Sequence, residues 1–459
     1  MYDIIIVGGG ISGSIAAIAA SRKGSKTLLI EKNAYLGGAL TAAGVGPMMT
    51  FHAGRKLIIK GITNELIQRL VVKGKSPGHI LDTTGYTYSV TPFEAESMKV
   101  ELENMIYEAG GEILYHTMLA SVKVENQKIT SITICNKEGL TTVEGLCFID
   151  ATGDGDLSAW AGVQCFKGRE EDSITQPMTL NVKMNHVNIE QIKEYMRDHP
   201  EIYEDRLELL DKSPRLSIGG FRELVDKGKA HGFLPHNIKG SILLFETDKP
   251  GEVILNCTRI AGRDSTDPIS LSLAESEGRR EVEELLEFLP KYMPGFKEAR
   301  VMYSGPSIGV RSSRQIKGHY TIEAEDLVMS KTFVDTIAHS AYPIDIHSSE
   351  GTGGETIKMP AGSYYNIPFS SMTNPVVDNL ITVGRCISAT FKAQGAIRVS
   401  PTAGAIGHAG GIGAWLYVEE GRNSVKEINI KRLQKVIEEQ DAYINLNEVI
   451  DDKLEVLYE

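Results

Sequence analysis

The sequence predicts an α/β fold in which a parallel β-sheet is built from both ends of the chain and is interrupted by an inserted α+β domain. Residues 2–7 are a β-branched apolar run, typical of a buried parallel strand, and a small-residue helix follows over 14–23. A second buried strand is expected over 27–30. Near the other end, residues 379–384 form an apolar strand ending in glycine, and a Gly/Ala-rich helix begins near Thr402. Two matching halves so far apart indicate one domain assembled from both chain ends.

The turn after the first strand has the pattern of a dinucleotide-binding loop, G-x-G-x-x-G. Gly8 permits a tight turn, Gly10 lets the backbone approach a pyrophosphate, and Gly13 lets the helix pack on the strand. The N–H groups at the helix start favour phosphate. Glu31 ends the second strand and can accept hydrogen bonds from a ribose hydroxyl. Strand, glycines, helix, strand and acid in this order predict a Rossmann-like nucleotide-binding domain.

Composition excludes several classes of partner. The 459 residues include 60 Asp and Glu against 48 Lys and Arg, a formal charge of −12, so we expect no nucleic-acid partner. No apolar run is long enough to cross a bilayer and no basic leader precedes the first strand, so we expect no membrane contact and a cytoplasmic location. No two cysteines have C-x-x-C spacing, so we predict no metal site and no iron–sulfur cluster; they are Cys135, Cys147, Cys165, Cys257 and Cys386.

Further elements complete the first half of the chain. Apolar residues at helical spacing predict an amphipathic helix over 92–109, followed by a strand over 113–115. Residues 119–124 and 129–135 alternate as in a hairpin. A strand over 145–149 then leads into Asp150-Ala-Thr-Gly-Asp-Gly-Asp156, a second strand–glycine-turn–helix junction.

The middle of the chain alternates strands with polar helices, which favours an α+β insertion. Strands are expected over 178–184, 240–245 and 253–260, and a helix over 273–288. The acidic run 201–210 is interpreted as a solvated helix face rather than a binding site. We divide the chain into a first nucleotide-binding part, an inserted substrate domain, a second nucleotide-binding part and a C-terminal helical cap, with the ranges 1–170, 171–372, 373–422 and 423–459.

Motifs along almost the whole chain resemble those of known flavoproteins. Beyond the first glycine loop they are Gly37-Gly38-Ala39-Leu40-Thr41, 149–156, Asn256-x-Thr258-Arg259, Asp264-x-x-Asp267, Gly309-x-Arg311-x-x-Arg314, Asp345-Ile-His347, Ile367-Pro368, Gly384-Arg385 and 398–411. In this order, they resemble the FAD-dependent oxidoreductases of the glutathione-reductase-type two-dinucleotide-fold group. More narrowly, they resemble the family that includes the flavoprotein part of heterodisulfide reductase.

The resemblance implies non-covalent FAD. His52 could in principle attach the flavin covalently, but we reject this because only its location in the sequence supports it. Lys32 would lie along the adenosine edge, or be a surface lysine, and Asp154 or Asp156 could instead serve as a helix N-cap. The helix start at 402–405 would stabilise the anion of reduced flavin. The expected cofactor-binding residues are Gly8, Gly10, Ser12, Gly13, Glu31, Lys32, Gly38, Ala39, Leu40, Thr41, Leu119, Ala151, Thr152, Gly153, Asp156, Gly384, Arg385, Thr402, Ala403, Gly404 and Ala405.

The sequence has no second nucleotide motif for a nicotinamide. Between residues 160 and 370 the nearest approach is Gly351-Thr-Gly353-Gly354, which follows a polar run rather than a strand. We therefore expect electrons to be exchanged with a separate, unidentified donor or acceptor.

Three residues are the candidates for substrate chemistry. His347 has the pKa range for proton transfer, and Arg311 can fork onto a substrate carboxylate. Arg398, like Arg385, could bridge flavin and substrate or pair with a carboxylate. We expect hydride transfer between flavin N5 and a small polar substrate whose identity the sequence does not give. An oxidase, an electron-transfer subunit of a larger complex, and a homo-oligomeric assembly stay open.

Overall fold

The computed structural model describes residues 1–235, 238, 240–348, 354–360, 362–446, 449, 451 and 454. Part of the Gly351–Gly354 loop and of the predicted C-terminal cap therefore lies outside the described residues. None of the helices in these ranges combines the length and the apolarity that a membrane span requires.

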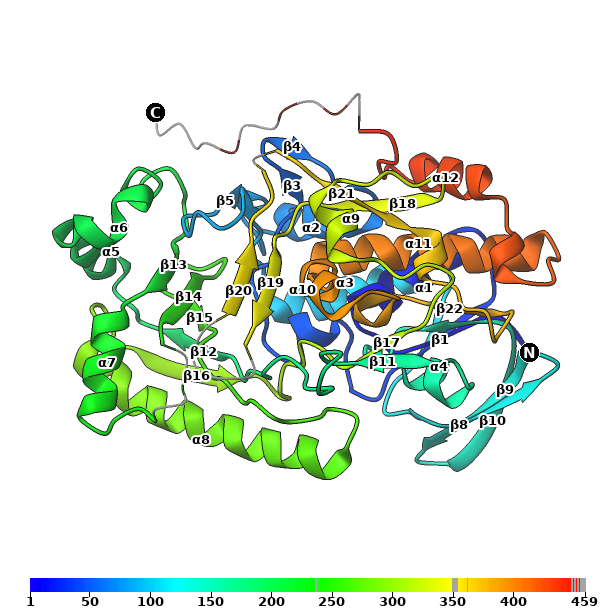
Figure 1. The fold of residues 1–459 in the computed structure, drawn as a ribbon, viewed down its shortest axis with the longest axis horizontal. Helices are drawn as coiled ribbons and strands as arrows, with labels where there is room; N and C mark the ends of the chain where they lie inside the picture. Colours follow the sequence, from blue (N-terminus) through cyan, green and yellow to red (C-terminus); the bar gives the residue numbers. More distant parts are fainter. Residues whose placement is uncertain are drawn as a thin grey trace.

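The central parallel sheet joins both ends of the chain, as predicted (Figure 1). Its strands pair in the order β7-β2-β1-β10-β22, each pair parallel. The terminal half of β10 lies between β1 and β22, with Val7 opposite Asp150 and Asp150 opposite Thr382. The strand bounds are β1 (Tyr2–Val7), β2 (Thr27–Ile30), β7 (Glu112–Leu114), β10 (Gly139–Asp150) and β22 (Leu380–Thr382).

Both faces of this sheet are covered, which explains the continuous apolar run of β1. Ile4 and Ile6 belong to the hydrophobic core shared with helices α1 (Ile11–Arg22) and α11 (Ser400–Glu419). Ile5 and Val7 point the other way, toward the core under the antiparallel strands. Those strands are β8 (Met118–Glu125) and β9 (Lys128–Asn136), the predicted hairpin.

Glycines set the close packing of α11 on α1. A Cβ atom on Gly407 would lie 2.2 Å from the carbonyl oxygen of Ser12, and one on Gly411 would lie 2.3 Å from that of Ala16. The two helices therefore touch backbone to backbone, and the sheet strands at opposite ends of the chain are locked together by their helices. The other helices of this part are α2 (Gly61–Val72), α3 (Ala95–Glu108), α4 (Asp156–Trp160), α9 (Ala324–Val328) and α10 (Phe391–Ile397).

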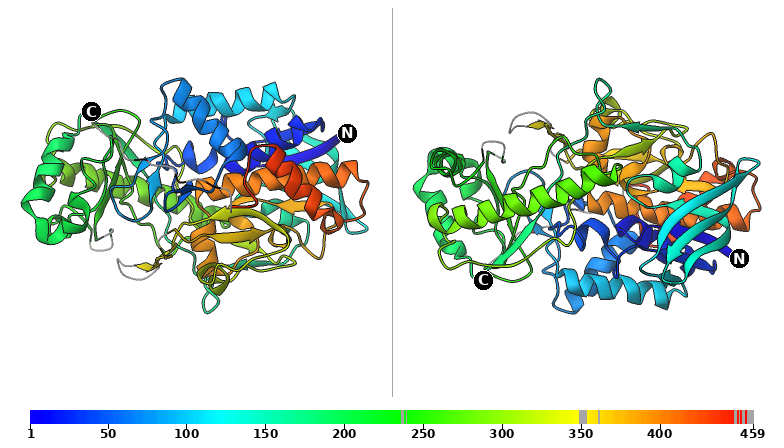
Figure 2. Two further views of the ribbon diagram at one scale, coloured as in Figure 1. Left: turned by 90° about the horizontal axis from the view of Figure 1, so that it is seen from above. Right: turned by 90° about the horizontal axis from the view of Figure 1, so that it is seen from below.

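The insert has its own antiparallel sheet and its own core. The sheet order is β13-β14-β15-β12-β16, and every pairing within it is antiparallel. Figure 2 shows α8 running along the insert toward the nucleotide-binding part. Its bounds and those of its neighbours are α5 (Ile189–Asp198), α6 (Pro200–Leu207), α7 (Arg222–Ala230), α8 (Pro268–Tyr292), β12 (Val182–Asn185), β13 (Ser217–Gly220), β14 (Ile242–Glu246), β15 (Val253–Leu255) and β16 (Arg300–Ser304).

Two elements of the insert differ in length from the predictions. The strands expected over 178–184 and 253–260 are shorter because the chain leaves the sheet, and only an isolated bridge joins Met178 to Ile260. The helix expected from 273 begins five residues earlier, because Asp267 caps it by accepting a hydrogen bond from the backbone N–H of Ser270 at 2.6 Å.

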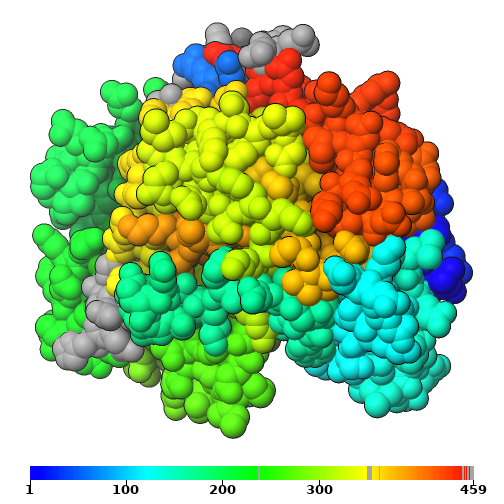
Figure 3. Space-filling model, turned by 45° about the vertical axis from the view of Figure 1, so that its right-hand side comes forward, coloured from blue at the N-terminus to red at the C-terminus, as the bar shows by residue number. Residues whose placement is uncertain are grey.

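The core of the insert is narrower than the predicted range 171–372. Its apolar residues come from 180–299, whereas those of 322–369 pack in the core of the nucleotide-binding part. Strand β18 (Thr336–Ser340) pairs with β21 (Tyr365–Pro368), and helix α12 (Ile430–Glu439) lies beside them, with Gln434 donating to the carbonyl of Val334 at 2.9 Å. Figure 3 shows these yellow and red segments forming one continuous face.

Candidate active site

A cavity of about 720 Å³ lies where the nucleotide-binding part and the insert meet. One part of its wall comes from the segment after the first glycine loop, including Ala39 and Met49. A second part comes from 309–311, 342–347 and 398–400. The insert supplies a third part from α5, α6, the end of β13, the start of α7 and β14, and Thr84, Tyr86 and Arg385 also line the cavity.

The first glycine loop fits a pyrophosphate. A Cβ atom on Gly13 would lie 1.9 Å from the carbonyl oxygen of Gly8, and one on Gly8 would lie 2.3 Å from that of Ala151, so the backbone itself requires these two glycines. Gly10 is different, because a Cβ atom there would meet only the Cα of Gly38, at 3.9 Å. Gly10 is also the N-cap of α1, with no side chain capping the helix. The open space beside uncapped N–H groups suits a phosphate.

The expected adenosine residues lie at the end of β2 and beyond. Glu31 is buried, and its carboxylate accepts hydrogen bonds from the N–H of Gly9 at 2.6 Å and of Asn33 at 2.8 Å. It therefore lies against the glycine loop, where a ribose is expected. Lys32 is exposed, and Leu119 is half-buried on β8. Their roles toward adenosine stay predictions.

The Gly38–Thr41 segment lies directly against the first glycine loop. Gly38 is so close to the loop that a Cβ atom would lie 2.8 Å from the Cα of Gly10. Ala39 is exposed and lines the cavity, whereas Leu40 is buried in the core. Thr41 is also buried, and its hydroxyl donates to the carbonyl of Leu36 at 2.6 Å. Of these four residues, Ala39 is the one that borders the cavity.

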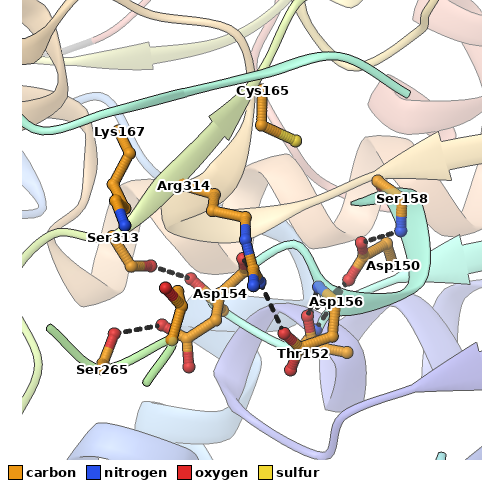
Figure 4. Close-up of polar contacts among 12 residues, drawn as sticks. Asp150, Thr152, Asp154, Asp156, Ser158, Cys165, Lys167, Ser265, Ser313 and Arg314 are labelled. Carbon is orange, nitrogen blue, oxygen red and sulfur yellow. Dashed lines mark hydrogen bonds and ion pairs between the residues drawn. The ribbon is translucent and has the colours of Figure 1, made fainter. Parts of the chain in front are cut away.

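The Asp150–Asp156 junction is held by its own hydrogen bonds (Figure 4). Asp150 accepts from the Thr152 hydroxyl at 2.7 Å and from the Ser158 N–H at 2.7 Å. The N-cap of α4 is Gly155, so the alternative that Asp154 or Asp156 caps this helix is wrong. Asp156 instead pairs with Arg314 at 2.7 Å. This pairing explains why Arg314, unlike Arg311, is not among the residues that line the cavity.

Arg385 links the two parts of the molecule. Its guanidinium donates to the carbonyls of Gly153 and Val310 and to the carboxylate of Asp154, each at 2.6 Å. Burial would raise the pKa of Asp154, but Arg385 and the hydroxyls of Ser313 and Ser265 offset this and lower it. Of the two roles predicted for Arg385, the pairing with a carboxylate is observed, and its side chain also lines the cavity.

The glycine-rich helix α11 begins two residues earlier than the predicted start at Thr402. Its N-cap is Val399, and Pro401 occupies its first turn, a position that suits proline. Val399 and Ser400 line the cavity, whereas Thr402 is buried and its hydroxyl donates to that of Ser340 at 2.8 Å. The predicted start near Thr402 is therefore correct to within two residues, and the cofactor-binding roles of 402–405 stay predictions. Residues 403–405 continue into the second turn, and Gly404 packs on Thr63 of α2.

The last two expected cofactor positions meet each other. A Cβ atom on Gly384, which follows β22, would lie 2.8 Å from the hydroxyl oxygen of Ser12 in the first glycine loop. Gly384 has a φ of +80°, in the left-handed region that favours glycine. The two ends of the chain thus meet at the predicted cofactor site.

The three candidate catalytic residues border the same cavity, together with Asp345. The Nε2 atom of His347 lies 3.2 Å from Oδ2 of Asp345, and Nη2 of Arg398 lies 3.7 Å from the same oxygen. Arg311 is buried and donates to the carbonyl of Pro177 at 2.6 Å and to the side-chain oxygen of Asn256 at 3.1 Å. The sequence predicted these three residues; their catalytic roles stay predictions.

Charge–charge interactions perturb the groups of this cluster. Burial would raise the pKa of Asp345, but the hydrogen bond from His347 and the charges of Arg398 and Arg311 hold it well below its usual range. Burial and the charge of Arg398 lower the pKa of Arg311 to about 10. Asp345 is thus a carboxylate and Arg311 a cation at neutral pH.

Two tyrosines beside this cluster were not predicted. Tyr86 and Tyr342 line the cavity with their rings 5.6 Å apart, edge to face. Burial and the charge of Asp345 raise the pKa of both phenols, so both stay protonated and can donate a hydrogen bond. They lie far apart in the sequence, in no recognisable motif, so no local signal could have found them.

Sequence reasoning also missed the contribution of helix α6. The run 201–210 was interpreted as a solvated face, but Ile202, Tyr203 and Arg206 line the cavity. That interpretation is wrong in part, because the helix turns one side toward the nucleotide-binding part. His52, by contrast, is buried with its ring Nδ1 2.8 Å from the Ser89 hydroxyl, and it is not a lining residue.

Comparisons with known proteins identify the family. A family model described as FAD dependent oxidoreductase matches residues 3–437, and the chain belongs to this family. FAD is therefore its cofactor, as predicted.

The curated relatives are distant. The chain is 24% identical over 201 residues to digeranylgeranylglycerophospholipid reductase from Thermoplasma acidophilum, covering 41% of this chain and 48% of that protein. It is 28% identical over 134 residues to thiamine thiazole synthase from Aeropyrum pernix, covering 29% of this chain and 43% of that protein. The chain spans about half the length of the curated relatives it matches. Among solved structures, a geranylgeranyl bacteriochlorophyll reductase-like protein from Thermoplasma acidophilum has a TM-score of 0.48 and 15% identity, covering 96% of this chain and 83% of that chain.

Proposed function

We propose that this protein holds FAD non-covalently and catalyses hydride transfer between the flavin N5 and a small polar substrate that carries a carboxylate. The observation that supports this most directly is the shared cavity, because it joins the expected flavin-binding segments to Arg311, His347 and Arg398. The bound flavin supplies the redox chemistry, and the protein supplies orientation and electrostatics.

The chain's own residues have distinct tasks in this proposal. The glycine loop at Gly10, with the uncapped N–H groups at the start of α1, holds the pyrophosphate, and Val399 and Ser400 at the start of α11 border the isoalloxazine end of the site. Arg311 binds the substrate carboxylate. The Nε2–H group of His347 donates a hydrogen bond to the Asp345 carboxylate, which orients the ring. The imidazole exchanges protons with the substrate during the redox step.

The electron partner in this proposal is a separate carrier. The larger sheet of the insert is antiparallel in the described part of the chain, which does not match the parallel βαβ unit of a nicotinamide domain. We also propose the finer grouping with glutathione-reductase-type flavoproteins and the flavoprotein part of heterodisulfide reductase, on the order of the motifs. A cytoplasmic location stays a prediction.

The first test is an absorbance spectrum of the purified protein, repeated on the supernatant after denaturation. We expect two visible flavin bands and a yellow supernatant. Colour that stays with the precipitated protein would contradict non-covalent binding, and a colourless protein that FAD cannot reconstitute would contradict the whole proposal.

A second measurement separates the alternatives. Anaerobic bleaching of the flavin by carboxylate-bearing substrates, without peroxide formation in air, supports electron transfer to a carrier. Rapid peroxide production would identify an oxidase instead. Flavin that bleaches only with a co-purifying protein would identify an electron-transfer component of a larger complex.

A further inference from the structure

The insert gives the cavity a wall that a small polar substrate would leave without contacts. Its large side chains are mostly aromatic or aliphatic and come from α5, α6, the start of α7 and β14: Tyr195, Ile202, Tyr203, Phe221, Leu243 and Phe245. The rings of Tyr203 and Phe221 pack with that of Tyr195 and are buried in the core of the insert, so the side chains that a ligand could contact are chiefly Tyr195, Ile202 and Leu243. Arg206, Arg222 and Glu223 also line this wall, and Arg206 donates to the carbonyl of Gly219.

The facing wall has more positive than negative charge. The hydrogen bonds of the buried Arg311 go to two neutral oxygens, those of Pro177 and Asn256. Arg398 has a buried Nε atom without a hydrogen-bond partner in the described part of the chain. Asp345 is the one carboxylate of this wall among the described lining residues, and it already contacts His347 and Arg398.

Two arginines that share a single carboxylate at the edge of a cavity favour an anionic ligand. A buried charge without a counter-charge is costly, and a carboxylate that pairs with it removes that cost. The guanidinium of Arg385 does not add to this excess, because Asp154 neutralises it at 2.6 Å. Arg311 and Arg398 are therefore the pair that an incoming anion would meet.

We propose that the substrate is an amphipathic carboxylate: its anionic end binds Arg311 and Arg398, and its apolar body packs on the wall formed by α5, α6 and β14. This inference rests on the proposed hydride transfer to or from a carboxylate-bearing substrate, and it replaces the small polar body of that substrate with an apolar one. A molecule of this kind matches both walls at once, whereas a short polar acid matches only one and a neutral lipid only the other.

The test compares three probes by titration calorimetry with the FAD-loaded protein: 4-phenylbutyrate, butyrate and 4-phenylbutan-1-ol. We expect 4-phenylbutyrate to bind at least about tenfold more tightly than either of the others, because burying a phenyl ring and pairing a carboxylate each contribute that much. If butyrate binds as tightly as 4-phenylbutyrate, the proposed contact with an apolar body is wrong. If 4-phenylbutan-1-ol binds as tightly, the proposed contact with an anionic end is wrong.

Variants assign each preference to its wall. Ile202→Ser combined with Leu243→Ser should remove the preference for 4-phenylbutyrate over butyrate, since both side chains line the cavity and neither is fully buried. Arg311→Gln should remove the preference for the acid over the alcohol, with Arg398→Gln as the second choice if the first fails to fold. Ile269→Ser on α8, which is 73% exposed and not a lining residue, is the matched control and should bind all three probes as the wild type does.

The spectrum of each sample separates the two proposals. A protein that lacks flavin bands contradicts the proposed function, whatever the titration gives. A protein that retains FAD but shows no preference among the probes contradicts the substrate class alone. A control variant that loses the preferences as strongly as the lining variants would also overturn the assignment to these walls.

Discussion

The nucleotide-binding part and the insert border the same cavity, but they are built in different ways. The nucleotide-binding part relies on backbone approach: Gly13 touches Gly8, and Gly407 touches Ser12, at distances that leave no room for a side chain. The insert relies on side chains from separate elements, such as Ile202 on α6 and Leu243 on β14. Backbone requirements leave a signature in the sequence because only glycine satisfies them, whereas an apolar wall resembles any other apolar surface.

The strongest test of the backbone side of this comparison is Gly13→Ala. The new Cβ atom would lie 1.9 Å from the Gly8 carbonyl oxygen, so α1 must move away from β1. We expect a loss of about 3 kcal/mol in the free energy of unfolding, together with loss of bound FAD. Denaturant unfolding and the flavin absorbance measure the two effects.

Gly10→Ala is the matched control for that variant. Its Cβ atom meets only the Gly38 Cα at 3.9 Å, and its φ of −62° suits alanine. Stability should stay within about 0.5 kcal/mol of the wild type, while FAD binds at least about tenfold more weakly. Wild-type FAD affinity in Gly10→Ala would show that the cofactor does not approach the loop there.

Arg385→Gln tests the connection between the two regions. The variant loses hydrogen bonds to Val310 and Gly153 and leaves the Asp154 carboxylate without its guanidinium partner. We expect a loss of about 2–3 kcal/mol, somewhat below the cost of breaking a fully buried pair because Arg385 is partly exposed. Arg422→Gln is the control, since the Arg422 side chain is 42% exposed and Glu420 keeps Arg432 as a partner, so the loss should be less than about 1 kcal/mol. Equal losses in both variants would contradict a linking role for Arg385.

The smallest effect is a pH dependence that belongs to the nucleotide-binding part. Burial lowers the pKa of His408 on α11 to about 4, although its hydrogen bond with Gln440 at 2.8 Å opposes this shift. The unfolded chain therefore binds more protons than the folded chain between pH 6.5 and 4. This contribution to stability is fully present above pH 6.5 and is lost as the pH falls toward 4.

From pH 7 to pH 5 His408 should account for about 1–2 kcal/mol of lost stability. Urea unfolding at the two pH values should show a drop in stability that is smaller by this amount in His408→Gln than in the wild type. His231→Gln changes an exposed histidine of the insert and should leave the wild-type drop intact. An unchanged drop in His408→Gln would contradict a buried neutral imidazole.

Local sequence patterns predict those elements whose residues act on their immediate neighbours. The sequence predicted strand β1, the glycine loop with Glu31, the β8–β9 hairpin and the sheet built from both chain ends. It could do so because the spacing of apolar residues, β-branching and the need for glycine are local properties. The FAD cofactor followed from the same motifs, and the family match confirms it. The cluster of Arg311, His347 and Arg398 was predicted as residue types, but not as a geometry.

Which of these residues meet depends on how distant segments of the chain pack together. That packing paired Arg385 with Asp154 and Arg314 with Asp156, and it placed Asp345 between His347 and Arg398. It also moved the start of α11 to Ser400 and turned one side of α6 toward the cavity. These outcomes depend on contacts between segments far apart in the chain, where the same arginine or isoleucine satisfies many environments equally well and packing alone selects one.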